Sequence, residues 1–438
     1  MPWYVTLTIM FGILLVFLFS GLPVAFAFVV TNFIVIYFFM GGVAAFSMTV
    51  NSGFQMLNNF LLIPLPLFII LGSIVFTSGY GWLLIDALDD FIGRLPARMS
   101  VVVIAFGFMF GTVSGVPMGT VAMLGRMFSP EMLKRGYSKL LTLGPICTSG
   151  VLTMVNVCSA IGVLLGGLAG ASVGRILAGL LFPSLLMAIL CIIYIIFVVI
   201  RHPEQAPKYQ PKPITAKKRL QSAGYILPLI FVIFAVVVVV YLGIATPSEA
   251  AATGALAMFI VVACFKKLTW TAFKRAMMGA AETTTMVLFI IWGSITFSQV
   301  MAFTGATRSL TQMVSNLDVA PVVSVILMQL VIILLTRFMD LISVTVITTP
   351  IFSAVATALG LNLVWFCAIT VINLGAATMI PPFGMELFTM KGVAPPEVTM
   401  GDIIKAAFPF YLVLCVGIAI MIIFPQIIMF FPNIIYGT

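Results

Sequence analysis

Charged residues are scarce in this sequence. Of its 438 residues, 8% are charged and 62% are hydrophobic, whereas an average soluble domain has about 25% charged and about 45–50% apolar residues. A water-soluble protein is therefore excluded. The apolar residues, about 270 in number, suffice for on the order of a dozen bilayer crossings of about 20 residues each. Strict alternation of polar and apolar residues is also scarce, which predicts an all-α polytopic membrane protein instead of an outer-membrane barrel.

Histidine and paired cysteines are nearly absent as well. His202 is the single histidine, and the six cysteines stand alone in apolar stretches without a Cys-x-x-Cys pair. Metal sites and acid–base catalysis that depend on histidine thus lose their usual residues. The G-x-S-x-G, H-E-x-x-H and Walker-type motifs are missing too. We therefore expect no enzyme, no catalytic residue and no cofactor here, and an ATP-driven pump would need its nucleotide domain on another chain.

Basic residues outnumber acidic ones, 21 to 12, and they gather in loops. This pattern indicates membrane topology, and nucleic-acid binding is not expected. The one strongly hydrophilic segment, residues 201–222, carries a run of Lys and Arg that the positive-inside rule places in the cytoplasm. It divides the chain into a first membrane repeat, residues 1–200, and a second, residues 223–438.

Weak landmarks relate the two halves. The run Phe76-Thr77-Ser78-Gly79 recurs as Phe303-Thr304-Gly305, Pro130 recurs as Pro350, and Ser149-Gly150 recurs as Leu374-Gly375. The separation between the two members is nearly the same for all three pairs. Landmarks that repeat at nearly one offset predict an internal duplication.

Each half also places helix-breaking or polar residues at membrane depth. Residues 111–120 (GTVSGVPMGT) and residues 336–343 (TRFMDLIS) predict re-entrant helical hairpins near 111–130 and 336–359. A second interrupted segment follows each hairpin, at residues 148–159 and 373–384. Broken backbone is tolerated in a membrane only where it lines a cavity enclosed by protein. Paired breaks therefore indicate the ion and substrate site of a transporter.

A sodium ion needs several hard oxygen ligands, which hydroxyls, amide oxygens and unwound carbonyls supply without adding charge. The candidates for such a sodium and substrate site are Ser114, Gly115, Ser149, Gly150, Thr153, Asn156, Asp340, Asn373, Gly375, Thr378, Pro381 and Pro382. Each Ser or Thr has an alternative role, because its hydroxyl can bond back to its own helix. Half-helix N-termini at the breaks present free N–H groups, which suits an anionic substrate such as a carboxylate.

Charges at membrane depth are costly and often functional. Arg126 either binds a substrate carboxylate or extends to the membrane surface from the mouth of the hairpin. Arg337 and Asp340, three positions apart, form either a structural ion pair or part of the site. Glu282 and Glu386 are either coupling acids or ordinary helix-end residues.

Several motifs together resemble one known family. They are residues 63–69 (IPLPLFI), 114–115 (SG), 134–137 (KRGY), 245–252 (ATPSEAAA), 338–340 (FMD), 358–361 (ALGL), 373–374 (NL) and 381–384 (PPFG). The chain resembles, over essentially its whole length, the large membrane subunit of TRAP transporters, the tripartite ATP-independent periplasmic transporters. The runs at 245–252 and 373–384 are the most specific.

This resemblance implies an inverted repeat and an elevator-type secondary transporter, in which a domain carrying the two hairpins slides against a fixed scaffold. It also implies a multi-pass protein of the bacterial inner membrane, a small membrane subunit as a separate polypeptide, and a periplasmic substrate-binding protein. Sodium would be the coupling ion, bound at the hairpin tips and the adjoining unwound helices. The cargo would be an organic anion of the carboxylate class.

Two other functions stay open at this stage. One is a stand-alone, ion-coupled transporter of dicarboxylates or other anions with the same hairpin arrangement. The other, from a different class, is an integral-membrane enzyme, for which Asp340 and Glu386 are the acid pair to test.

Overall fold

All regular secondary structure in the described part of the computed structural model is helical. The residues that the structure describes are 3–20, 22, 24–39, 46–58, 62–81, 83–84, 87, 97–115, 117–206, 216–241, 244–305, 309, 320–337, 341–381 and 384–436. No β-strand occurs in these ranges. The predicted all-α class is therefore confirmed. Among the described residues, four helices are long and apolar enough to cross a membrane, namely α10 (Val173–Arg201), α13 (Trp270–Phe303), α16 (Leu341–Ala358) and α19 (Met400–Ile423).

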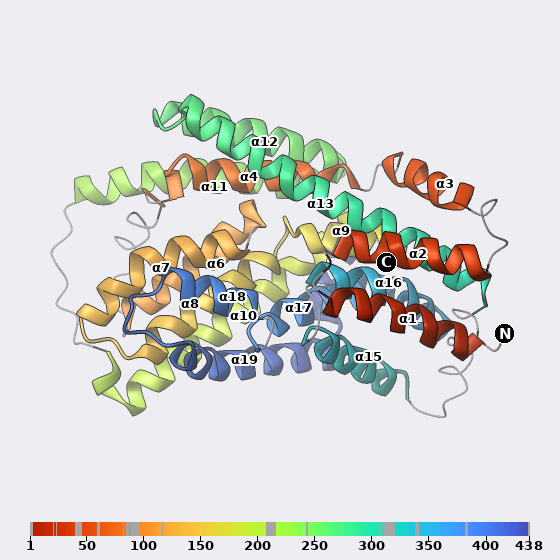
Figure 1. Cartoon of the computed structure of the whole chain (residues 1–438). Coiled ribbons are helices and arrows are strands. Elements are labelled where there is room, and N and C mark those ends of the chain that lie inside the picture. The colour runs from red at the N-terminus through yellow and green to blue at the C-terminus, as the bar shows by residue number, and fades with distance from the viewer. Residues whose placement is uncertain are drawn as a thin grey trace.

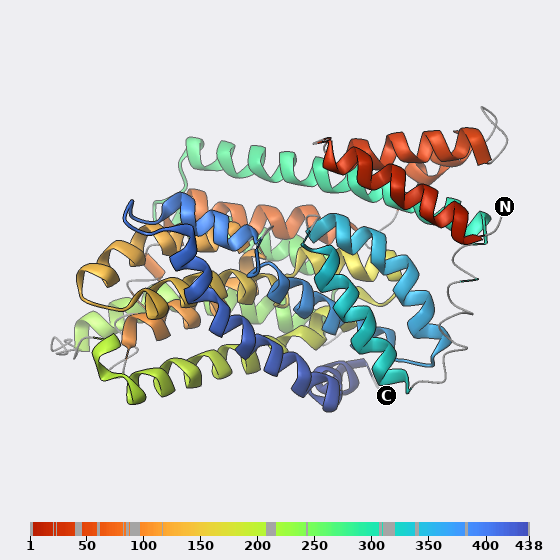
Figure 2. The ribbon, with the colours of Figure 1, turned by 60° about the horizontal axis from the view of Figure 1, so that its bottom comes forward.

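One group of helices forms a layer along one side of the molecule. We call it the α13 layer; besides α13 it contains α1 (Trp3–Phe19), α2 (Val24–Phe39), α3 (Phe46–Leu57), α4 (Pro64–Thr77), α11 (Ala216–Tyr241) and α12 (Pro247–Cys264). Within it α4 packs against α12 and α13, and α13 packs against α2 and α3. Helices α4, α11, α12 and α13 run along the upper side in Figure 1, and α1–α3 accompany α13 in Figure 2.

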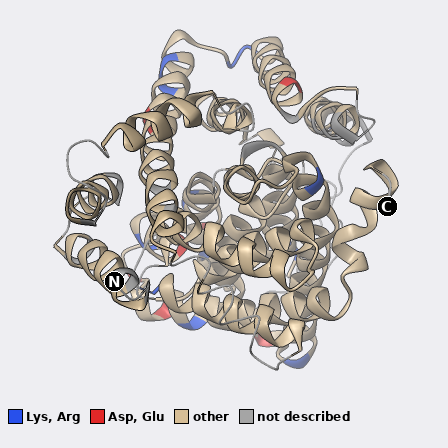
Figure 3. Ribbon diagram, turned by 90° about the vertical axis from the view of Figure 1, so that its right-hand side faces the viewer, with Lys and Arg blue, Asp and Glu red and all other residues tan. Residues whose placement is uncertain are grey.

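The remaining helices form a second group, which we call the hairpin bundle. Besides α10, α16 and α19 it contains α6 (Arg98–Ser114), α7 (Pro117–Lys134), α8 (Lys139–Met154), α9 (Ala160–Ala169), the short 3-10 helix η3 (Pro203–Gln205), α15 (Pro321–Leu335), α17 (Leu363–Ala377), α18 (Met385–Val393) and α20 (Gln426–Tyr436). Its centre is α8, which packs against α6, α7 and α19. The main contacts with the α13 layer join α13 to α16, α4 to α6 and α9, and α10 to α11. Charged residues are sparse along the ribbon (Figure 3).

The same order of elements occurs twice in the hairpin bundle. Helices α7 and α16 are each followed by a glycine with positive φ, Gly136 (87°) and Gly360 (70°). Two positions later Ser138 and Asn362 cap the next helices, α8 and α17. Both of these helices are interrupted, and each continues as a shorter helix, α9 or α18, before a long one, α10 or α19. Glycine serves at these turns because it adopts positive φ without a steric penalty.

Two predicted boundaries differ from the observed ones. The predicted hairpins near 111–130 and 336–359 cover mainly the second leg of each: α6 and α15 form the first legs, and α7 continues through Pro130 to Lys134, since a long helix can accommodate a single proline at the cost of one hydrogen bond. In the predicted loop at residues 201–222, α10 extends to Arg201 and α11 begins at Ala216. Residues 207–215 of that loop lie outside the described ranges, and its cytoplasmic location stays a prediction.

The run ATPSEAAA begins a helix in the α13 layer. The Thr246 side chain accepts the N–H of Glu249 at 3.3 Å, and the Glu249 carboxylate accepts the N–H of Thr246 at 2.7 Å. Pro247 occupies the first turn, where a missing N–H costs nothing. This motif is therefore a capping box that fixes the start of α12.

We expect the substitution Thr246→Ala to lower the free energy of unfolding by about 1 kcal/mol, because it removes the cap from α12. Thr253→Ala on the same helix is the matched control, since the exposed Thr253 only bonds back to the carbonyls of Glu249 and Ala250. Denaturant unfolding in detergent measures both. Equal midpoints for the two variants would show that the cap contributes nothing.

Candidate functional site

The first break lies between α8 and α9, at residues 155–159. The Asn156 side chain is fully buried there. Its Nδ2 donates to the Phe108 carbonyl of α6 at 3.0 Å, and its Oδ1 accepts the Val157 N–H at 2.9 Å. The α9 start is capped by the Ser159 hydroxyl, which accepts the Gly162 N–H at 3.0 Å. Asn156 thus ties the interrupted backbone to the first hairpin, and its amide supplies hydrogen bonds that a continuous helix would have made itself.

Glycines on the first hairpin let its backbone lie directly on α8. A Cβ atom on Gly107 would lie 2.5 Å from the Ser149 Cβ, and one on Gly111 would lie 2.6 Å from the Thr153 Cα. At the hairpin turn, Gly115 has a φ of 56° and packs against the Cys158 carbonyl in the break. Small residues permit such close approach of membrane helices. The predicted residues Gly115, Ser149, Thr153 and Asn156 are therefore brought together.

The hydroxyls at both breaks bond to their own helices. Ser149 donates to the Ile146 carbonyl at 2.6 Å, Thr153 to the Ser149 carbonyl at 2.8 Å, and Thr378 to the Gly375 carbonyl at 2.6 Å. These are the back-bonding contacts of the alternative role. They use the hydroxyl protons and leave oxygen lone pairs as acceptors. A cation ligand needs those lone pairs, so the two roles are compatible.

The second break lies between α17 and α18, and an arginine holds part of it. The partly buried Arg337 donates from Nη2 to the Ala377 carbonyl at 2.6 Å, and from Nη1 to the carbonyls of Ile380 at 2.7 Å and Pro381 at 3.1 Å. Its planar guanidinium suits several acceptors at once. Arg337 therefore replaces the helical N–H groups that these carbonyls lack.

Asn373 is also engaged within the protein. Its Nδ2 donates to the backbone carbonyl and the side-chain oxygen of Gln329 on α15, at 3.0 and 2.9 Å. Gln329 in turn donates to the Thr370 hydroxyl at 3.0 Å. This buried polar cluster joins α17 to the second hairpin, as Asn156 joins the first break to α6.

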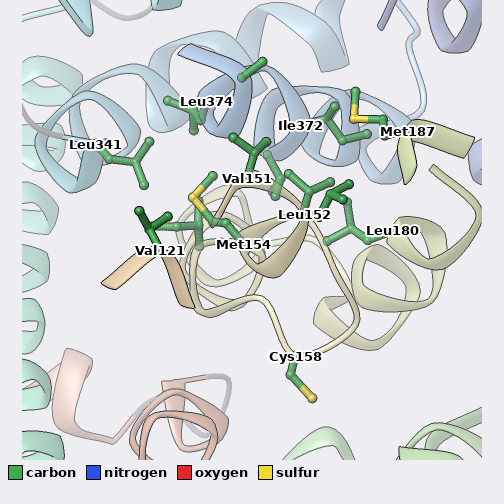
Figure 4. Close-up of a cluster of buried hydrophobic side chains, with 14 of the residues drawn as sticks. Val121, Val151, Leu152, Met154, Cys158, Leu180, Met187, Leu341, Ile372 and Leu374 are labelled. Carbon is green, nitrogen blue, oxygen red and sulfur yellow. The ribbon is translucent and has the colours of Figure 1, made fainter. Parts of the chain in front are cut away.

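The two interrupted helices cross each other at the predicted glycines. A Cβ on Gly375 would lie 2.8 Å from Val155 Cγ2 and 2.9 Å from Met154 Cε, and a Cβ on Gly150 would lie 2.9 Å from Glu386 Cγ. Apolar side chains surround this crossing, with Val151 and Met154 of α8 beside Leu341 and Leu374 (Figure 4). The structure thus places Gly150, Gly375 and Thr378 at one location, although the two breaks belong to opposite halves of the chain.

Other predicted residues lie elsewhere. Arg126 is exposed on α7, and the neighbouring Gly125 faces Met390 and Val393 at the C-terminal end of α18. Arg126 follows Pro117 by two and a half helical turns, about 14 Å along the helix axis, so it is not brought to the hairpin tip; its carboxylate-binding role stays a prediction. Glu282 is exposed on α13. Asp340, Pro382 and the side chain of Ser114 lie outside the described residues.

Two residues of the crossing were not in the predicted set. The sequence pairs Arg337 only with Asp340, and no local signal points to the carbonyls that it binds, because they lie about 40 positions further along the chain. Glu386, considered as a coupling acid or a helix-end residue, does lie in the first turn of α18, but its side chain is completely buried. An open hollow of about 260 Å³ lies away from these residues, lined by Gly167, Leu168, Ile295, Gln299, Ala302 and Pro350.

Paired interrupted helices in the two halves of a helical membrane protein are common among secondary transporters. The sequence matches, over residues 11–427, the family model described as the tripartite ATP-independent periplasmic transporter, DctM component. The chain therefore belongs to this TRAP transporter family, and the predicted resemblance is confirmed.

Several similar proteins are named as TRAP transporter permeases. The C4-dicarboxylate large permease protein DctM of Pseudomonas aeruginosa is 25% identical over 87% of this chain and 88% of its own length. The ectoine large permease protein TeaC of Halomonas elongata is 26% identical over 98% of this chain and 99% of its own length. The isethionate permease protein DctMQ of Oleidesulfovibrio alaskensis is 26% identical over 98% of this chain and 66% of its own length. These similarities point to a transporter permease and away from an enzyme.

Solved structures share the fold. The YdaH transporter of Alcanivorax borkumensis matches with a TM-score of 0.62 at 13% identity, over 86% of this chain and 87% of that one. The MtrF protein of Neisseria gonorrhoeae matches with a TM-score of 0.55 at 14% identity, over 91% and 94%. At such low identity the likeness concerns the fold alone.

We expect Gly150→Ala to destabilise the protein by about 1–3 kcal/mol, because the new Cβ would lie 2.6 Å from Val121 Cγ2 of α7 and 2.9 Å from Glu386 Cγ of α18 and would overpack this contact. Gly224→Ala on α11 is the matched control, since no atom lies within 4 Å of the added methyl group. That change should instead stabilise the helix, by up to about 1 kcal/mol. Thermal midpoints in detergent measure the change in stability of both variants. A Gly150→Ala variant that is more stable than the wild type would contradict the close packing at Gly150.

Arg337→Lys should cost about 1.5–3 kcal/mol, because an ammonium group cannot reach all three carbonyls of the second break. The matched control is Arg126→Lys, which changes an exposed arginine of the first hairpin. Hydrogen exchange over residues 375–390 should rise in Arg337→Lys and stay unchanged in the control. Wild-type exchange in both variants rules out the bracing role of Arg337.

Proposed function

We propose that this protein is the large membrane subunit of a sodium-coupled TRAP transporter in the bacterial inner membrane. It imports an organic anion of the carboxylate class, with a small membrane subunit and a periplasmic binding protein as partners. The observation that carries this proposal is the crossing of two interrupted helices in a chain of the TRAP family. Paired interruptions in corresponding positions of two halves are the common location of ion and substrate sites in secondary transporters.

The chemistry at the crossing supports sodium as the coupling ion. The hydroxyls of Ser149, Thr153 and Thr378 hydrogen-bond to backbone carbonyls of their own helices, and their oxygen atoms keep lone pairs for a ligand. Hard oxygen acceptors of this kind suit a small cation. In the described residues, no group of three or more His, Cys, Asp and Glu side chains forms a multivalent metal site.

The arrangement of elements supports an inverted repeat and an elevator-type movement. The order hairpin, interrupted helix and long helix occurs twice, with Gly136 and Gly360 at the corresponding turns. In this proposal the hairpin bundle is the transport domain and the α13 layer belongs to the scaffold. The movement takes place along the contacts of α16 with α13 and of α6 and α9 with α4.

The relatives suggest the class of cargo. Their names include a C4-dicarboxylate, isethionate and ectoine, all of which carry at least one carboxylate or sulfonate group. The helix N-terminus of α18, with the uncapped Gly384 before it, would favour such an anion. Gly384 offers no side chain to occupy the free N–H groups of this helix start.

The first test measures the thermal midpoint of the detergent-purified protein as sodium replaces choline at constant ionic strength. A ligand that binds only the folded state adds about 1.4 kcal/mol of stability at roughly ten times its Kd. We expect a saturable rise with sodium that is reduced in Ser149→Ala and in Thr378→Ala. Thr253→Ala, an exposed hydroxyl on α12, is the control and keeps the full response.

The second test measures uptake in proteoliposomes with a sodium gradient. Uptake should require the small subunit and the loaded binding protein. Uptake by the large subunit alone would favour the stand-alone anion transporter instead. If the thermal midpoint and the uptake are the same in sodium as in choline, the protein is not sodium-coupled.

A further inference from the structure

Glu386 is the one acidic residue of the described ranges whose side chain is completely buried. It lies in the first turn of α18, directly after the second break, and its Cγ would be 2.9 Å from a Cβ on Gly150 of α8. The carboxyl group thus lies between the two interrupted helices. Neither carboxylate oxygen has a hydrogen-bond partner among the described residues. A buried carboxylate without a partner is costly, so its position requires an explanation.

The groups around the carboxyl do not neutralise it. The Thr378 hydroxyl lies close enough to interact, but it donates its proton to the Gly375 carbonyl at 2.6 Å. The same hydroxyl and the backbone N–H of Glu386 interact with the carboxyl, but both groups are uncharged and cannot neutralise it. The Cys147 thiol of α8 also interacts electrostatically with the carboxyl and carries no positive charge. The start of α18 adds the partial positive charge of its helix dipole, which does not neutralise a full negative charge.

No basic side chain of the surrounding helices pairs with Glu386 in the described structure. Helix α18 packs against α7, α8 and α19. On these helices and on α18 itself, the basic side chains of Arg126, Lys134 and Lys405 are exposed. The other charged groups have partners elsewhere: Glu131 pairs with Arg135, Lys139 pairs with Asp402, and Lys391 donates to the Val398 carbonyl. Tyr411 interacts with Arg337 and Cys415. Arg337 itself is committed to the carbonyls of the second break.

Oxygen atoms from both halves therefore lie near the crossing, and no cationic side chain of the described residues pairs with the carboxylate. The Glu386 carboxylate and the Thr378 hydroxyl come from the second half, and the Pro117 carbonyl of the first hairpin lies beside Gly150. An ion here would contact both halves of the molecule at once. The residues present fit a small monovalent cation, since they combine hard oxygen ligands with one negative charge.

We propose that Glu386 is the anionic ligand of a sodium ion at the crossing of the two interrupted helices. The proposal rests on the sodium-coupled transport function proposed above and adds a charged ligand to it. The carboxylate compensates the charge of the ion, so that the occupied site is neutral and can be buried. The ion in turn pairs a carboxylate that otherwise destabilises the fold. Sodium therefore couples the packing of α18 to that of α8.

The test compares Glu386→Gln with the wild type in the sodium and choline series. Glutamine keeps the size of the side chain and removes its charge. In choline we expect a higher thermal midpoint than wild type, because a buried charge is gone. The apparent sodium Kd should weaken at least about tenfold, because the ion loses its charge-assisted ligand. Glu282→Gln, at an exposed glutamate of α13, is the matched control and changes neither quantity.

Each other result overturns the proposal in a distinguishable way. An unchanged sodium Kd in Glu386→Gln removes Glu386 from the ion site while leaving sodium-coupled transport intact. If that variant also loses a pH dependence of uptake seen in the wild type, the carboxyl carries a proton and not sodium. A wild type without any sodium response removes both this site and the proposed coupling.

Glu386→Asp covers the case in which the glutamine variant does not fold. It retains the charge but shortens the side chain by one methylene group. We expect it to keep a sodium response with a measurably weaker Kd in ²²Na binding. An Asp variant with the wild-type Kd would contradict a direct contact between this carboxylate and the ion.

Discussion

An interrupted helix inside a membrane protein must find partners for its freed backbone groups within the protein, because lipid offers none. The hairpin bundle is organised around this constraint. At the first break the amide of Asn156 links the backbone to α6. At the second the guanidinium of Arg337 holds the carbonyls of Ala377, Ile380 and Pro381. Two breaks at corresponding places in the chain are thus stabilised by different chemistry, one neutral and one cationic.

The close approach of the backbones follows from the absence of side chains. Gly107 and Gly111 allow α6 to lie on α8, and Gly150 and Gly375 allow the two interrupted helices to cross. This packing brings hydroxyl oxygens and one carboxyl group into a small buried volume. A group of acceptors that is enclosed in this way stores an electrostatic cost, and a cation relieves that cost. At the proposed sodium site, stability without the ion and affinity for the ion are therefore opposed.

Helix starts set the position of the elements around the crossing. The capping box of Thr399 and Asp402 begins α19, and Asp402 also pairs with Lys139 at the start of α8, at 2.8 Å. The long helix α19 and the interrupted helix α8 are thereby held together at one end. The family match and the shared fold with solved transporters agree with this architecture. Each of these caps and turns is formed by a few neighbouring residues, and the turn and cap that precede α8 and α17 occur at comparable positions in both halves.

The sequence by itself determined the helical membrane class, the family, and the places where helices break. Glycine, proline, asparagine and hydroxyl residues act on the backbone within a few positions of themselves, so an interruption within residues 148–159 and 373–384 was predictable. The breaks occupy only the later parts of these ranges, since α8 continues to Met154 and α17 to Ala377. Tertiary structure alone decided which side chains complete the breaks. The sequence left Arg337 as part of an ion pair or as a site residue, but in the structure it binds carbonyls far along the chain. The sequence left Glu386 as a coupling acid or a helix-end residue, and in the structure its side chain is buried against Gly150 of the other half. Burial and partner choice depend on the packing of segments that are distant in sequence, and no local pattern encodes that packing.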